Sequence, residues 1–423
     1  MTALARPAGV SLTVDRRMVA AAAFILFGVV DIVGFGLHAR HGDATFAFAP
    51  EFAKVTVPNL SLPAALTAYV CGAVSIAAGL VRAFVPLGPV ARRISIGVVL
   101  FAFVVALLCW AEVGQPSAFS IVNLLQGTLE ASIPLILGAL AGCLCERSGV
   151  INIAIEGQLL FGAFTGAVAA SFFGVLWLGL ILGSAAGALL GAMLAVFAIR
   201  YLVDQVVLGV VLNVFAAGLT GFLYDRALVP YQNTLNSPST YLPVKIPLLG
   251  DIPIIGPVLF DSTIFLYITF VLLILVQVGL FSTRWGLRVR AVGEHPMAAD
   301  TVGIRVQATR YAAVIMGGLI AGIGGSYLTI GSNGNFTPNI SSGLGYIALA
   351  ALIFGRWTPF GALAAALLFG FTSELQSVLS TINVPIPSEI LLMAPYVATI
   401  VAVAGLVGRV RAPAADGKPY VKA

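Results

Sequence analysis

The apolar stretch WLGLILGSAAGALLGAMLAVFAI, residues 177–199, decides the fold of this protein. It holds no charged side chain, and at about 1.5 Å per residue a helix of this length crosses the ~30 Å hydrocarbon core of a bilayer. Gly183, Gly187 and Gly191 put small side chains on one face of that helix, so a neighbouring helix can approach closely. We interpret the stretch as a membrane-spanning helix packed within its own subunit, with a contact between subunits as the alternative.

The whole chain has the composition of a membrane protein. Of its 423 residues, 60% are hydrophobic and only 9% are charged, against roughly 25% charged residues in a soluble domain. Similar apolar runs begin near Met18, Leu62, Ile94, Ile121, Gly157, Trp177, Leu208, Thr263, Tyr311, Gly343, Pro359 and Glu389. Some of these runs are short or interrupted. We therefore predict an all-α polytopic membrane protein with about 10–12 transmembrane helices.

The basic residues predict the orientation of the chain. Threading the runs with the N-terminus inside leaves only Arg40, Lys54, Arg226 and Lys245, of the 22 Lys and Arg, on the outside. By the positive-inside rule both termini are cytoplasmic. We expect a cytoplasmic N-terminal tail over residues 1–17, a transmembrane domain over 18–408 with an outer loop at 226–262 and an inner loop at 282–310, and a cytoplasmic C-terminal tail over 409–423.

The inner loop contains a predicted docking helix. The loop has five arginines but only two acidic residues, Glu294 and Asp300. This excess of positive charge suits a membrane surface or an acidic docking face. From Glu294 to Ile304 the sequence is typical of a short helix with Pro296 in its first turn and Gly303 at its exit. Ala298 and Ala299 would make a slim surface that enters a groove on another protein. The alternative is a helix that lies flat on the membrane.

The sequence lacks the motifs of several classes of enzyme and binding site. Its single Gly-Lys pair, Gly417-Lys418, precedes a proline and forms no nucleotide-binding loop. No HExxH motif is present, and Cys143 and Cys145 have the wrong spacing for a redox pair. We therefore expect no catalytic residues, no metal site and no cofactor. Because 17 acidic residues offset the basic ones, nucleic acid is not an expected partner.

Polar residues within one apolar run predict a solute pathway. Asn123, Gln126 and Glu130 follow at i, i+3 and i+7, so they share one helix face, and Pro134 would kink the helix beyond them. Such a lining suits a neutral, hydroxyl-rich solute. The alternative is a network of hydrogen bonds between helices with no solute.

The stretch ERSGVINIAIEGQ, residues 146–158, interrupts the apolar pattern. It places Asn152, Glu156 and Gln158 among β-branched residues, and we predict a broken helix or a re-entrant turn that lines the pathway. An interfacial cytoplasmic loop is the competing interpretation. Asn213 is a further candidate for the pathway, although, like Gln277 and Glu374, it is isolated in its run and equally suits a contact between helices.

Three runs in one order carry a resemblance to a known family: residues 146–158, RAVGEHPMAADTVGI at 290–304, and GLGYIALAALIFGRWTPFGALAAALLFG at 343–370. They resemble the permease subunits of ATP-binding-cassette (ABC) importers in the branched-chain amino acid and ribose superfamily, above all the nucleoside and simple-sugar uptake branch. The similarity covers roughly residues 120–408, and the first ~110 residues match less clearly.

The resemblance implies a bacterial inner-membrane permease with inverted internal repeats, which itself hydrolyses no ATP. Its implied partners are a second, related permease chain, a cytoplasmic ATPase with two nucleotide-binding cassettes, and an extracytoplasmic solute-binding lipoprotein. Residues 294–304 would be the helix that couples to the ATPase, and 226–262 would face the binding protein. Asp300 departs from the basic residue that the family often has there.

The implied solutes are nucleosides, then simple sugars, then branched-chain amino acids. An ion-coupled secondary transporter or channel without an ATPase is the alternative. Such a carrier would need buried acidic sites, for which Asp31, Glu130 and Glu374 are the candidates, unpaired along the sequence.

Overall fold

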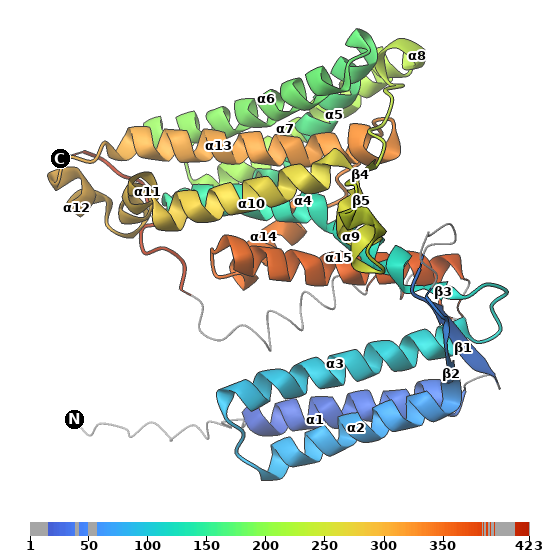
Figure 1. The fold of residues 1–423 in the computed structure, drawn as a ribbon. Helices are drawn as coiled ribbons and strands as arrows, with labels where there is room; N and C mark the ends of the chain where they lie inside the picture. The colour runs from blue at the N-terminus through green and yellow to red at the C-terminus, as the bar shows by residue number, and fades with distance from the viewer. Residues whose placement is uncertain are drawn as a thin grey trace, which may run out of the picture. The chain divides into compact units, whose positions relative to one another are not determined.

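The computed structural model describes residues 16–38, 42–49, 57–382, 384, 386, 387, 390, 393 and 411–422. Contacts divide the chain into two compact units, the first with α1–α3 and a small sheet and the second with the remaining helices (Figure 1). The predicted run from Glu389 lies almost entirely outside the described residues, as does most of the predicted N-terminal tail.

The first unit is a three-helix bundle. Its elements are α1 (Arg16–Val29), which continues as the π-helix η1 (Val30–Gly36), α2 (Ala64–Phe84) and α3 (Pro89–Glu112), with β1 (Asp43–Ala47), β2 (Leu60–Pro63) and β3 (Phe119–Ser120). Strand β1 lies between β2, to which it is antiparallel, and β3, to which it is parallel. A Cβ added at Gly28 would lie 2.6 Å from the carbonyl oxygen of Gly72, so glycines set the close approach of α1 to α2.

The second unit is built on seven long helices. These are α4 (Ile121–Arg147), α5 (Ile155–Phe173), α6 (Leu176–Ala195), α7 (Gln205–Leu223), α10 (Ile264–Ser282), α13 (Val306–Ser326) and α15 (Pro359–Thr381). Three of them continue as π-helices, η2 (Val196–Arg200), η3 (Tyr224–Leu228) and η5 (Tyr327–Asn333). The remaining elements are α8 (Gln232–Leu235), β4 (Val244–Lys245), η4 (Leu249–Asp251), α9 (Ile255–Phe260), β5 (Asp261–Ser262), α11 (Arg284–Glu294), α12 (Pro296–Thr301) and α14 (Leu344–Phe354).

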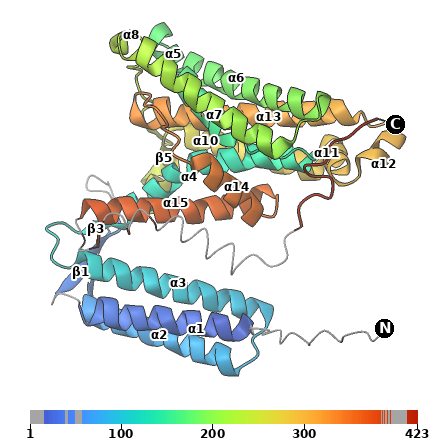
Figure 2. The same cartoon turned by 180° about the vertical axis from the view of Figure 1, so that it is seen from behind.

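Glycine allows α5, α6 and α13 to pack side by side (Figures 1 and 2). A Cβ added at Gly318 would lie 2.5 Å from the carbonyl oxygen of Gly187, and one at Gly322 would lie 2.6 Å from that of Gly183. Real side chains do not tolerate such distances from a backbone atom, so these helices touch backbone to backbone. The predicted packing of the glycine face within one subunit is confirmed.

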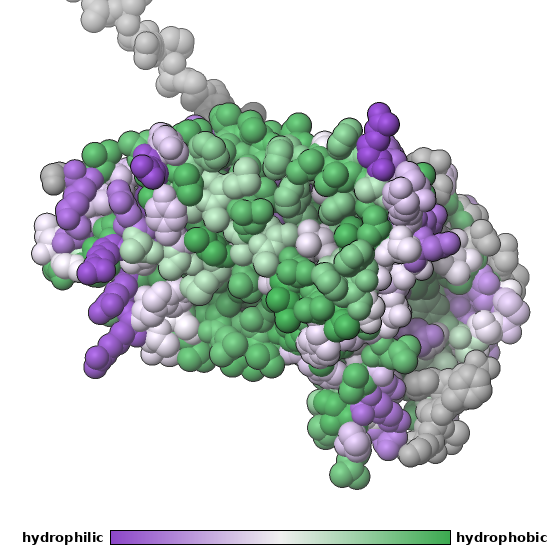
Figure 3. Space-filling view, turned by 90° about the horizontal axis from the view of Figure 1, so that it is seen from above, coloured by the Kyte–Doolittle hydropathy of each residue, from purple (hydrophilic) through white to green (hydrophobic). Residues whose placement is uncertain are grey.

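Ten helices among the described residues are long and apolar enough to cross a membrane, and α14 is a shorter apolar helix. Helix α4 is the most enclosed of the ten, while α6 leaves Trp177, Ile181 and Leu189 more than half exposed. Figure 3 shows hydrophobic side chains across the middle of the face that includes α6 and α13, and hydrophilic ones toward its ends. The chain is therefore an all-α, multi-pass membrane protein, as predicted. The inverted repeats stay a prediction.

The predicted outer loop, residues 226–262, has little regular structure. Strands β4 and β5 pair in antiparallel register, and Lys245 forms an ion pair of 2.7 Å with Asp251. The short elements α8, η4 and α9 complete the loop. Pairing of β4 with β5 ties the middle of the loop to the start of α10.

Candidate functional site

A first polar cluster lies on α4. Asn123, Gln126 and Glu130 all belong to this helix, as the spacing predicts, with Asn123 exposed and the other two half-buried. The Gln126 amide Nε2 donates to the carbonyl oxygen of Asp261 at 3.3 Å, and its side chain hydrogen-bonds Glu130. This face of α4 therefore reaches the start of α10 with polar groups that are partly open.

Glu374 of α15 joins this cluster, although the sequence leaves it isolated. A Cβ added at Gly127 would overlap the Glu374 carboxyl group and lie 2.9 Å from its Cγ. The absence of a side chain at Gly127 thus makes a notch in α4 that holds this carboxyl group, one residue from Gln126 and one turn from Glu130. The two half-buried glutamates interact electrostatically, and both also act on Tyr327.

The predicted interruption between α4 and α5 is present. Helix α4 ends at Arg147, α5 begins at Ile155, and residues 148–154 form no regular helix. Gly149 has φ +87°, in the left-handed region that favours glycine. Ser148 and Asn152 are fully buried. Protein therefore covers this non-helical backbone, the condition under which a bilayer tolerates it.

Side chains from α5 and α7 form a second polar cluster around the interruption. Asn152 Nδ2 donates to Gln158 Oε1 at 3.1 Å. Asn213 Oδ1 accepts from the Gly157 amide at 2.8 Å, and its Nδ2 donates to Ile153 O at 2.9 Å and to the Tyr346 hydroxyl at 3.1 Å. Asn213 is thus bonded to the start of α5, and the interhelical contact considered for it is present.

Glu156 has a role that the sequence does not reveal. One carboxylate oxygen accepts from the Ser341 hydroxyl at 2.6 Å and the Gly343 amide at 2.8 Å, and the other accepts from the Gly345 amide at 2.7 Å. The side chain is 7% exposed. A charged acceptor on free amides at a helix start offsets their loss of solvent, so Glu156 fixes the beginning of α14.

A short helix, α12, is present where the sequence predicts one, but it differs from the prediction in where it begins and in the position of one alanine. Pro296 is its first residue and Gly303 follows its end with φ +85°, as expected, whereas Glu294 is the last residue of α11. Ala298 is exposed, but Ala299 is 4% exposed. The expectation that both alanines face outward is wrong for Ala299, because that face of the helix packs onto the protein's own apolar residues.

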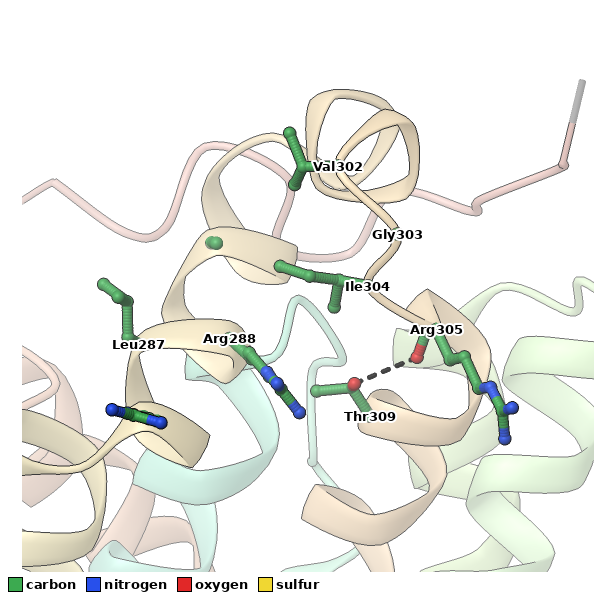
Figure 4. A pocket seen from close by; sticks show the side chains of 9 residues that line it. Leu287, Arg288, Val302, Gly303, Ile304, Arg305 and Thr309 are labelled. Atoms are coloured by element: carbon green, nitrogen blue, oxygen red, sulfur yellow. Dashed lines mark hydrogen bonds between the residues drawn. The ribbon is translucent and has the colours of Figure 1, made fainter.

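Beside α12 lies a basic cavity of about 810 Å³ between α11 and the start of α13 (Figure 4). Its lining residues are Arg284, Leu287, Arg288, Ala291, Val302, Gly303, Ile304, Arg305 and Thr309. The lining contains three arginines and no carboxylate, and Arg288 extends from α11 toward the start of α13. Such a cavity favours acidic groups.

Within the described residues, no group of three or more His, Cys, Asp or Glu side chains is arranged to hold a metal ion. The polar groups of both clusters offer hydrogen bonds rather than a nucleophile with its base. The arrangement therefore suits the binding and passage of a polar solute.

Comparison with known proteins relates the chain to transport components. Residues 123–407 match the family described as the permease component of branched-chain amino acid transport systems. The chain is 44% identical over 308 residues to the guanosine ABC transporter permease protein NupQ of Bacillus subtilis, which covers 71% of this chain and 96% of NupQ. It is 40% identical over 316 residues to the nucleoside ABC transporter permease protein NupC of Lactococcus lactis, covering 72% and 99%.

A second guanosine ABC transporter permease protein of Bacillus subtilis, NupP, is 26% identical over 310 residues and covers 68% of this chain and 85% of its own length. No solved structure matches the chain. The family match begins after α1–α3, so these three helices lie outside it.

Proposed function

We propose a solute and a set of partners for this chain, which belongs to the family of permease components of branched-chain amino acid transport systems. It is a permease subunit of an ABC transporter and a transport component rather than an enzyme, which confirms the function predicted from the sequence. We propose that it carries nucleosides across the bacterial inner membrane, with both termini in the cytoplasm. The similarity to NupQ, a guanosine permease, and to NupC, a nucleoside permease, supports nucleosides as the solute.

The proposed pathway includes Gln126, Glu130 and Glu374, with Asn123 at the exposed end. The Glu374 carboxyl group in the notch at Gly127 is the observation that carries this proposal. In either protonation state a carboxyl group keeps acceptor oxygens, which match the hydroxyl donors of a ribose ring. Dinucleotide-binding folds use an acidic side chain for the same ribose contact.

The second polar cluster, with Asn152, Glu156, Gln158 and Asn213, would support this pathway. Asn152 Oδ1 and Gln158 Nε2 are buried and have no hydrogen-bond partner among the described residues, so they can bond a passing solute or water. The polar atoms of Glu156 and Asn213 form hydrogen bonds within the protein. We therefore propose that those two residues position α5, α7 and α14.

The proposed ATPase docking surface comprises α12 and the basic cavity beside it. Exposed Met297, Ala298 and Val302 supply an apolar patch next to Arg288 and Arg305. An acidic groove on an ATPase with two cassettes would complement this surface. A second permease and a solute-binding lipoprotein at the 226–262 loop complete the proposed transporter. The second permease is supported by the two guanosine ABC transporter permease proteins of Bacillus subtilis, NupQ and NupP, that the chain resembles.

The test compares uptake of guanosine and 2′,3′-dideoxyguanosine by the complete transporter in cells that otherwise take up neither. If the glutamates bond the ribose hydroxyls, Glu374→Gln raises KM for guanosine by about tenfold or more, since a hydrogen bond to a charged group contributes roughly 1.5–3 kcal/mol. For the dideoxy solute, which lacks these hydroxyls, the same substitution should raise KM much less. Equal losses for the two solutes would refute the ribose contact.

Gln376→Ala provides the matched control, because Gln376 lies on the same helix and hydrogen-bonds Ser380 within it. Its uptake should match that of the unaltered transporter. Radiolabelled ribose and leucine, tested alongside, decide among the solute classes. Uptake of leucine but not of guanosine would overturn the proposed solute.

A further inference from the structure

The described C-terminal segment, residues 411–422, packs against the loop that carries α12. The Ala415 amide donates to the carbonyl oxygen of Gly293 at 2.9 Å, and the Ala414 amide donates to Glu294 Oε2 at 3.2 Å. Both acceptors belong to the last two residues of α11. The segment is therefore attached at the point where the chain turns into α12.

Arg310, in the first turns of α13, joins this segment to the interruption between α4 and α5. Its side chain is only 1% exposed. Nε donates to the carbonyl oxygen of Ser148 at 3.1 Å, and Nη1 donates to that of Lys418 at 3.1 Å. A Cβ added at Gly149 would lie 2.8 Å from Arg310 Nη2 and 3.1 Å from the Ala415 carbonyl oxygen, so three separate parts of the chain meet here.

Asp416 extends the same contact toward the end of α4. Its side chain hydrogen-bonds Glu146, which also accepts from the Trp357 indole nitrogen. It interacts electrostatically with Arg310. A Cβ added at the next residue, Gly417, would lie 2.7 Å from the Ile151 side chain. The C-terminal segment thus lies directly on the interruption.

Tyr420 attaches the far end of the segment to α12. It is 6% exposed and packs in a small apolar cluster with Val292, Ala299 and Val306. Its hydroxyl hydrogen-bonds Asp300. The inward face of α12 therefore rests on Tyr420, which explains why Ala299 is buried.

We propose that residues 411–422 form a strap that transmits movement of α12 to the interruption at 148–154, with Tyr420 and Asp416 as positioning residues. The proposal rests on the proposed docking of an ATPase at α12. Helix α12 has six residues and buries only Ala299, so its own contacts hold it weakly. Coupling between sites is carried by chains of packed side chains and hydrogen bonds, and the strap supplies both between α12 and the interruption.

The strap makes no hydrogen bond to Gln126, Glu130 or Glu374 among those of the described residues. Its loss should therefore spare binding of the solute while it weakens the link to ATP hydrolysis. The expected signature is more ATP hydrolysed per solute imported, with KM for the solute unchanged. A merely structural role would lower the amount of transporter and leave this ratio unchanged.

The experiment uses the complete transporter in proteoliposomes and measures ATP hydrolysis and guanosine uptake in the same vesicles. Tyr420→Ala and, independently, Asp416→Ala are expected to raise the ratio of ATP hydrolysed to solute imported by roughly fivefold or more, as for a typical coupling between sites. Tyr420→Phe keeps the apolar packing and should restore most of the coupling. Lys422→Ala, at an exposed position of the same segment, should behave as the unaltered protein.

An unchanged ratio in both alanine variants, each present at normal levels in the vesicles, would overturn the proposed strap. Proportional losses of uptake and hydrolysis would overturn it as well. Failure of the proposed function is a separate outcome, because the unaltered transporter would then show no guanosine uptake.

Discussion

Replacement of Glu156 by alanine is expected to release the start of α14. The carboxylate accepts three hydrogen bonds, two of them from the backbone amides of Gly343 and Gly345. Alanine leaves two buried donors, the Gly345 amide and the Ser341 hydroxyl, without this acceptor, whereas the Gly343 amide is only part-buried.

The expected magnitude follows from those two buried donors. An unsatisfied buried donor costs about 1–3 kcal/mol, so Glu156→Ala should lower the free energy of unfolding by roughly 2–6 kcal/mol. That is a large part of the ~5–15 kcal/mol by which folded proteins are stable. Glu156→Gln keeps one acceptor oxygen, so its free energy of unfolding should fall by about half as much.

The assay is thermal unfolding of the detergent-solubilised protein, followed by the fraction that remains monodisperse. Glu156→Ala should lower Tm by roughly 2 °C or more, and Glu156→Gln should fall between it and the unaltered protein. Glu374→Ala is the matched control, because Glu374 is half-buried and its carboxyl group accepts no hydrogen bond from the part of the chain that the structure describes. Equal Tm values for Glu156→Ala and the unaltered protein, or an equal loss in Glu374→Ala, would refute this account of Glu156.

Three further perturbations have defined outcomes. Gly318→Val should lower Tm by separating α13 from α6 at Gly187, since overpacking costs about 1–3 kcal/mol; a Tm equal to that of the unaltered protein would contradict the packing. Ala298→Trp should abolish co-purification with the ATPase while leaving Tm unchanged, whereas Ala299→Trp should lower Tm because that site is buried. The same effect in both variants would count against the docking surface. Burial raises the pKa of Asp416 from 3.8 to about 7, so the strap binds best with Asp416 neutral and loosens as pH rises from about 4 through 7. Hydrogen exchange of residues 411–422, corrected for the intrinsic rate, should show this, and Asp416→Asn should weaken the pH dependence, since only the Glu146 carboxyl group of the hydrogen-bonded pair then titrates.

The sequence by itself determined the features that depend on neighbours along the chain. Length and hydropathy predicted the spans, and the interruption before Ile155 followed from polar residues and glycine amid apolar ones. Pro296 and Gly303 marked the limits of α12 because each restricts or frees the local backbone dihedrals.

Only the tertiary structure decided the contacts between residues distant in sequence. Glu374 reaches the notch at Gly127, Glu156 bonds the start of α14, and Tyr420 buries Ala299. From the sequence alone, Glu374 is an isolated polar residue, Glu156 is a candidate pathway residue and Tyr420 belongs to a tail. Periodicity shows which face of a helix a side chain occupies, but not what that face contacts. Close packing of helices brings those faces together, and it turns a glutamate unpaired in the sequence into part of a polar cluster.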